Sequence, residues 1–144
     1  MKSKTILTVI ALSFLFSCNP APHSNPETEK IVNDFFDTYR NSPKKAIVTL
    51  LAKNRWITNE DTNKLVVQLD ELLGQIGKFQ GQELIRQDSY GKNILQYVYI
   101  AKYERQPLKF IFRFYRPNDA WDFHSFNYEV DFMNALDEIS DIPD

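Results

Sequence analysis

The stretch PLKFIFRFYR, residues 107–116, alternates large apolar side chains with a more mixed set. The two phases of this alternation are Leu108, Phe110, Phe112 and Phe114, and Lys109, Ile111, Arg113 and Tyr115. Because successive side chains of a β-strand point to opposite faces, this pattern predicts a strand with one face against a core. We expect the phenylalanine phase to face that core and the mixed phase to face outward.

Three segments around this stretch show the same period of two. They are residues 82–90 (QELIRQDSY), 93–104 (NILQYVYIAKYE) and 121–130 (WDFHSFNYEV). The turn signals YGKN and PNDA separate neighbouring segments, which favours an antiparallel meander. Within the second segment the alternation separates two sets, Val98 and Ile100 from Tyr97, Tyr99 and Tyr103. It does not fix which set shares a face with Arg113.

Three helices are predicted before the strands, because the apolar residues there recur at helical spacing. Each start is marked by a capping residue: Asn25 before Pro26, Ser42 before Pro43, and Thr58 with Asp61 in a capping box. The apolar stripes are Ile31, Phe35 and Tyr39, then Ala46, Ile47, Leu50 and Leu51, then Leu65, Leu69, Leu72 and Ile76. Gly77 is expected to end the third helix, and residues 131–140 to add a short terminal helical turn.

Helices followed by strands predict an α+β domain, with the N-terminal helices packed on one face of a curved antiparallel β-meander. We expect Trp56 and Ile57 to pack where the chain turns between the second and third helices.

This order resembles the cystatin-like superfold in its nuclear-transport-factor-like form. The segments LGQIGKFQGQELI, residues 73–85, and YIAKYERQ through NYE, residues 99–129, look like those of uncharacterised exported bacterial proteins with that fold. The resemblance covers roughly residues 26–132. It implies a fold and no particular activity, since the superfold hosts isomerases, cyclases, binding modules and interaction domains.

The beginning of the chain predicts where the protein is found. Two lysines precede the uncharged run TILTVIALSFLF, residues 5–16, and the only cysteine, Cys18, follows. This is the pattern of a signal peptide, and the run is shorter than the roughly 20 residues that span a bilayer. The residues LFSC, 15–18, resemble the bacterial lipobox in Leu15, Ser17 and Cys18, whereas Phe16 departs from the smaller residues usual there.

The lipobox resemblance implies a lipid on Cys18, and we prefer this interpretation to a free or disulfide-bonded thiol. The predicted organisation is a lipoprotein signal peptide over residues 1–17, a tether over 18–25 and a single α+β domain over 26–144. The protein is then expected in the bacterial cell envelope, anchored by palmitate-type acyl chains to a membrane, on its periplasmic side or at the cell surface.

Composition argues against two classes of partner. Acidic residues outnumber basic ones, 19 against 17, and no basic stripe is present to neutralise phosphates, which disfavours nucleic-acid binding. The chain has two histidines, one of them, His23, in the tether. With Cys18 lipidated no Cys or His cluster is left, and a turn followed by a strand explains Asp119, Asp122 and His124. We therefore expect no metal site and no cofactor.

Two functional hypotheses follow from the residues. In the first, the protein is a non-catalytic envelope lipoprotein that binds a small ligand, an envelope protein or a second copy of itself. Its interface would be the outward strand phase of Lys109, Ile111, Arg113 and Tyr115.

The alternative is a small acid–base enzyme of the isomerase or cyclase type with its site in the cup of the sheet. Its candidate residues are Asp122, His124, Tyr97 and Tyr99, though no motif marks any of them as the base. Ser125 neighbours His124 but points to the other face of a strand, so the two do not suggest a nucleophilic pair.

Overall fold

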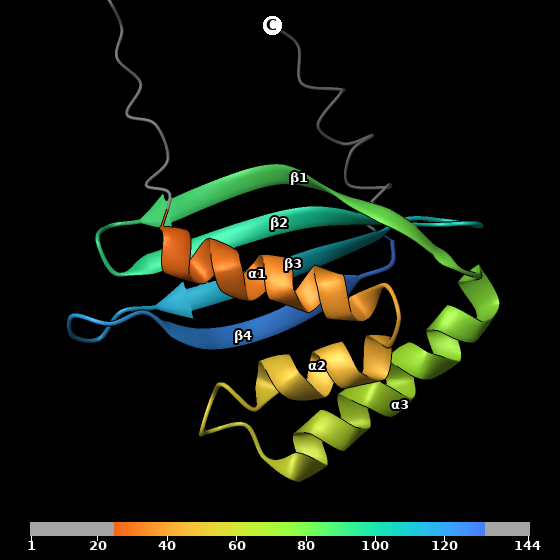
Figure 1. Ribbon diagram of the computed structural model, residues 1–144, viewed down its shortest axis with the longest axis horizontal. Coiled ribbons are helices and arrows are strands. Elements are labelled where there is room, and N and C mark those ends of the chain that lie inside the picture. Colours follow the sequence, from red (N-terminus) through yellow and green to blue (C-terminus); the bar gives the residue numbers. More distant parts are fainter. Residues whose placement is uncertain (1–24, 132–144) are drawn as a thin grey trace, which may run out of the picture.

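The structure, a computed structural model, describes residues 25–131 and consists of three helices followed by four strands (Figure 1). The elements are α1 (Pro26–Tyr39), α2 (Pro43–Leu51), α3 (Asn59–Ile76), β1 (Phe79–Tyr90), β2 (Ile94–Tyr103), β3 (Leu108–Tyr115) and β4 (Asp122–Glu129). The strands form one antiparallel sheet in the order β1-β2-β3-β4. The predicted α+β class, with helices on a curved meander, is confirmed.

The helix boundaries lie where the capping residues predicted them. The Asn25 side chain accepts hydrogen bonds from the backbone N–H groups of Glu27 and Thr28, and Ser42 accepts one from Lys45. Thr58 and Asp61 form a complete capping box at α3. These contacts satisfy backbone donors that the first helical turn leaves free, so each capping motif marks and stabilises the start of its helix.

The phenylalanine phase of β3 faces the helices, as the alternation predicted. Leu108, Phe110, Phe112 and Phe114 have no exposed surface. Helix α1 lies across this inner face of the sheet (Figure 1), and the rings of Phe35 and Phe36 contact those of Phe110 and Phe112 at centroid distances of 5.1–6.3 Å. Aromatic side chains from one helix and one strand therefore make the centre of the core.

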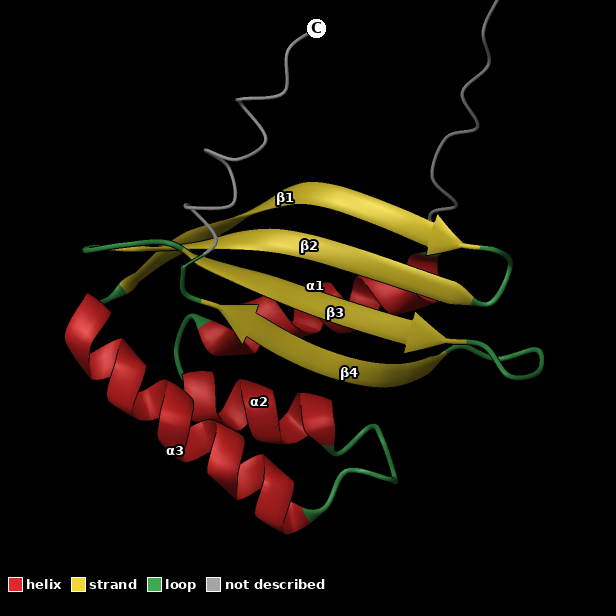
Figure 2. Ribbon diagram, turned by 180° about the vertical axis from the view of Figure 1, so that it is seen from behind, coloured by secondary structure: helices red, strands yellow, loops and turns green. Residues whose placement is uncertain are grey.

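The other two helices lie to the side of α1. Helix α2 is next to β4, and α3 packs against α2 further from the sheet (Figure 2). Leu69 and Ile76 of the predicted α3 stripe are buried, whereas Leu65 and Leu72 are half-buried. Helix α1 lies over the middle of the sheet (Figure 1), and α3 packs against α2 and contributes Val66, Leu69 and Ile76 to the core.

Strand β1 begins at Phe79, three residues before the predicted start at Gln82. Its pairing with β2 shifts register between Phe79 and Gly81, where Gly81 has φ +143°. Such a bulge interrupts the alternation on which the prediction rested. Phe79 nonetheless belongs to the strand and packs its ring against Tyr103 at 5.6 Å.

The tyrosines of β2 lie on the inner face. Tyr97 and Tyr103 are buried, and their hydroxyl oxygens lie 2.7 Å from Thr28 Oγ1 and 2.6 Å from the Tyr39 hydroxyl. Opposite residues of an antiparallel pair share a face, so the pairing of Gln96 with Arg113 puts the other phase of β2 on the outer face. The structure thus settles which residues accompany Arg113.

Several predictions fall outside the described residues. These are the signal peptide 1–17, Cys18, the tether up to residue 24, and the terminal helical turn after Asp131. Within residues 25–131, no helix combines the length and the apolar character needed to cross a membrane.

Candidate functional site

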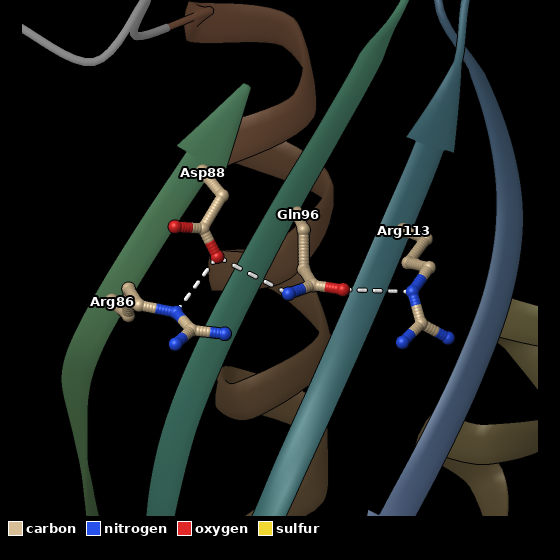
Figure 3. A network of polar contacts seen from close by, with 4 residues as sticks. All are labelled: Arg86, Asp88, Gln96 and Arg113. Carbon is tan, nitrogen blue, oxygen red and sulfur yellow. Dashed lines mark hydrogen bonds and ion pairs between the residues drawn. The ribbon is translucent and has the colours of Figure 1, made fainter. Parts of the chain in front are cut away.

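The outer face of the sheet, the side turned away from α1, carries a chain of hydrogen bonds across three strands (Figure 3). Arg86 Nε donates to Asp88 Oδ2 at 2.8 Å, and Gln96 Nε2 donates to the same oxygen at 3.2 Å. Arg113 Nε donates to Gln96 Oε1 at 2.7 Å. We call these four residues the polar strip.

The strand register produces the polar strip. Asp88 lies opposite Gln96, and Gln96 lies opposite Arg113, so their side chains stand side by side on one face. Gln96 is 6% exposed, yet both ends of its amide are hydrogen-bonded, which removes the cost of burying it. Arg113 uses only Nε here. Its two terminal nitrogens point away from Gln96 and have no partner among the described residues (Figure 3).

Beside the polar strip, the outer face carries three exposed apolar side chains that we call the apolar row. Tyr90 lies opposite Ile94, and Ile94 lies opposite Tyr115, so the row also crosses three strands. Their exposed fractions are 54%, 38% and 43%. No helix or strand within residues 25–131 covers this face (Figure 2), so the apolar row is in contact with solvent.

The four predicted interface residues differ in the surface that they offer. Tyr115 is exposed and Arg113 is partly exposed, as an interface requires. Ile111 is only 6% exposed because it lies at the centre of the face, opposite Val98 and between Lys109 and Arg113 along its strand. Lys109 Nζ forms an ion pair with Glu129. The accessible part of the face is therefore the end that carries Tyr115 and the apolar row.

A second candidate is a cleft of about 530 Å³ between the α2–α3 loop, residues 52–58, and the sheet, where β3 ends and β4 begins. Loop residues 53–56 line one side, and Tyr115, Asp122 and His124 are on the other. Trp56 is 78% exposed at this cleft, so the prediction that it packs where the chain turns is wrong. Of the two neighbours, only Ile57 packs against the core. The loop directs the Ile57 side chain inward and the Trp56 side chain outward.

Asn54 fixes the loop to the sheet at this cleft. Its Nδ2 donates to the backbone carbonyl of His124 at 2.7 Å, and its Oδ1 accepts from the backbone N–H of Trp56 at 2.9 Å. The His124 carbonyl is available because β4 bulges there: Arg113 pairs with Ser125 and Phe114 with Phe123, which leaves His124 between them. The contact between Asn54 and the His124 carbonyl joins residues 70 positions apart, so no local sequence pattern predicts it.

The four candidate catalytic residues do not form one site. Asp122 and His124 are exposed at the cleft, whereas Tyr97 is buried on the opposite side of the sheet with its hydroxyl bonded to Thr28. Tyr99 is half-buried among core aromatics, 4.9 Å from Phe36. Burial is the main cause that raises the pKa of both Tyr97 and Tyr99. No carboxylate or imidazole of the candidate set lies with a tyrosine on the inner face.

Two arginine side chains lie over tryptophan rings. Arg116 lies over the ring of Trp121 at 5.0 Å and donates to the carbonyl of Lys92, and Arg55 lies over Trp56 at 4.8 Å. Arg113 joins the polar strip through its hydrogen bond to Gln96 on the neighbouring strand.

The described residues contain no cluster of three or more His, Cys, Asp or Glu side chains that would hold a metal ion. Comparison with protein-family models and with curated proteins gave no match to this chain. Two surfaces of the molecule are therefore the candidates for function: the outer face of the sheet and the cleft beside the α2–α3 loop.

Proposed function

We propose that this protein is a lipid-anchored module of the bacterial cell envelope that works by binding and not by catalysis. In this proposal the lipid on Cys18 holds the chain at a membrane, and the outer face of the sheet binds an envelope protein or a second copy of the chain. The observation that carries the binding role is the apolar row, which lies exposed beside an ordered polar strip.

The composition of this surface supports binding to a protein. Tyrosine and arginine are enriched among the residues that contribute most to protein interfaces, because they combine apolar area with hydrogen-bonding groups. Tyr115 and Tyr90 supply such area, and the free terminal nitrogens of Arg113 are suited to a carboxylate of the partner. Hydrogen bonds within the polar strip already hold Arg113 in place, which lowers the entropy lost on binding.

The alternative, an acid–base enzyme, has less support. The inner face where its site was expected is filled by Phe35, Phe36 and the phenylalanines of β3. Asp122 and His124 lie at an open cleft with no neighbouring wall that excludes water, whereas general acid–base groups are usually tuned by burial. Binding without catalysis is therefore the function that the geometry favours.

The binding proposal is tested with two variants of the full chain in detergent. The first, Arg113→Glu with Tyr115→Ala, changes the outer face, and the matched control, Lys45→Glu with Val48→Ala, makes the same kinds of change on exposed positions of α2. We expect only the first variant to lose self-association in sedimentation, or a specific partner crosslinked in envelope membranes. Equal behaviour of both variants and the parent would remove the outer face as the interface.

The anchor is tested separately by labelling cells with a palmitate analogue. The lipobox interpretation predicts that the parent incorporates the label and that Cys18→Ser does not, since the thioether needs the cysteine sulfur. Equal labelling of the two proteins would refute the lipid anchor without bearing on the outer face.

A further inference from the structure

The cleft beside the α2–α3 loop has a charge that differs from that of the whole chain. Its charged side chains are Lys53, Arg55 and Asp122, with the imidazole of His124 beside them. Cations thus outnumber acids here, although the net charge of the protein is −2. A local excess of positive charge on an acidic protein attracts anions to that place.

Trp56 gives the same cleft an apolar surface. It is the most exposed of the large apolar side chains that the structure describes, at 78%. The Arg55 guanidinium lies over one side of its ring, 4.8 Å from the ring centroid. This stacking holds a planar cation against the indole and leaves the rest of the ring surface open to the cleft.

The loop that carries both side chains is fixed before any ligand binds. Asn54 connects it to β4 through the His124 carbonyl and to the backbone N–H of Trp56, and Ile57 anchors its end in the core. An ordered loop loses little further entropy on binding, so even the few contacts of a small ligand can give a favourable free energy of binding. The cleft volume of about 530 Å³ lies within the range common for small-molecule sites.

We propose that this cleft binds a small anion that carries a ring with a face able to stack on an indole. The ring stacks on the open part of the Trp56 indole, and the anionic group lies between the Lys53 ammonium and the Arg55 guanidinium. A carboxylated sugar and an aromatic carboxylate share this chemistry. The proposal does not depend on the outer face, because its main residues belong to the α2–α3 loop.

The experiment follows the indole N–H signals of the ¹⁵N-labelled full chain in detergent micelles. The chain has two tryptophans, and Trp121 lies at a different cavity, so its signal is an internal control. The probes are glucuronate and benzoate, each compared with its neutral counterpart, glucose and benzyl alcohol. We expect at least one of the two anions to shift the Trp56 signal at millimolar concentration, with an affinity about tenfold above that of its neutral counterpart.

Two charge variants separate local contact from overall charge. Lys53→Glu with Arg55→Glu removes the cations of the cleft, and Lys44→Glu with Lys45→Glu makes the same change at the start of α2, outside the cleft. We expect the first to abolish the shift and the second to retain it, and added salt to weaken binding in the parent. The anion that binds with the higher affinity, glucuronate or benzoate, shows whether the ligand carries a sugar ring or an aromatic ring.

Three results would overturn the proposal: no Trp56 shift with either anion, equal affinity for the neutral probes, or equal loss in both charge variants. Because Lys53, Arg55 and Trp56 are exposed, their substitution leaves the core intact, and a circular dichroism spectrum identical to that of the parent verifies this.

Discussion

Truncation of Phe112 to alanine tests the assignment of the two faces of the sheet. Phe112 has no exposed surface, and its ring lies 5.1 Å from Phe35, 5.7 Å from Phe36 and 5.2 Å from Phe126. Removal of a fully buried phenylalanine costs about 3–5 kcal/mol, from lost burial and from the cavity that remains. Since its neighbours are aromatic rings that cannot readily close the gap, we expect a value near the upper end.

Such a loss is a large part of the roughly 5–15 kcal/mol that stabilise a typical domain, so Phe112→Ala is expected to unfold at a much lower urea concentration than the parent. Phe112→Leu keeps most of the volume and gives a measurable midpoint, with an expected loss of about 1–2 kcal/mol. Urea denaturation followed by circular dichroism gives both free energies of unfolding, with an unchanged m-value if only the native state is affected.

The matched control is Tyr115→Ala on the same strand. Tyr115 is 43% exposed on the outer face, and its truncation is expected to cost less than about 1 kcal/mol. A Phe112→Ala variant within about 1 kcal/mol of the parent, or a larger loss for Tyr115→Ala, would refute the assignment of the two faces.

Three further predictions concern local features. Gly77→Ala is expected to destabilise the fold by about 1–3 kcal/mol in urea denaturation, because φ is +87° and the new Cβ would lie 2.5 Å from the Glu104 carboxylate. The control Gly74→Ala places its Cβ in open space on α3 and should instead stabilise the fold by about 0.5–1 kcal/mol. Burial raises the pKa of Tyr39 and Tyr103, so the unfolded chain ionises first and stability falls as pH rises above about 10, by up to about 1.4 kcal/mol per pH unit for each tyrosine. Melts at several pH values should show a shallower fall for the variant Tyr39→Phe with Tyr103→Phe than for the parent. An equal dependence of stability on pH in the two proteins would contradict this prediction. Asn54→Ala is expected to cost about 1–2 kcal/mol and to shift the indole N–H signal of Trp56, because the loop loses its bond to β4.

Local sequence patterns were sufficient to predict the elements and the core. Asn25, Ser42 and Thr58 mark helix starts because each supplies an oxygen to backbone donors only two or three residues away. The phenylalanines of β3 face inward because strand geometry makes the face of a residue follow from its parity. Both are short-range effects, and the order of helices and strands then left few ways to bury the apolar faces.

The candidate sites depended on tertiary structure. The polar strip exists because the register of β1, β2 and β3 brings Asp88, Gln96 and Arg113 into one row, and no single segment records that register. The loop that carries the exposed Trp56 is held to the sheet by the bond between Asn54 and the carbonyl of His124, which are 70 residues apart and meet where β4 bulges. The sequence by itself determined the elements, their inward faces and, through the resemblance of residues 15–18 to a lipobox, a predicted anchor. Only the folded chain decided which polar side chains meet, because those contacts depend on strand register and loop packing between residues far apart in the sequence.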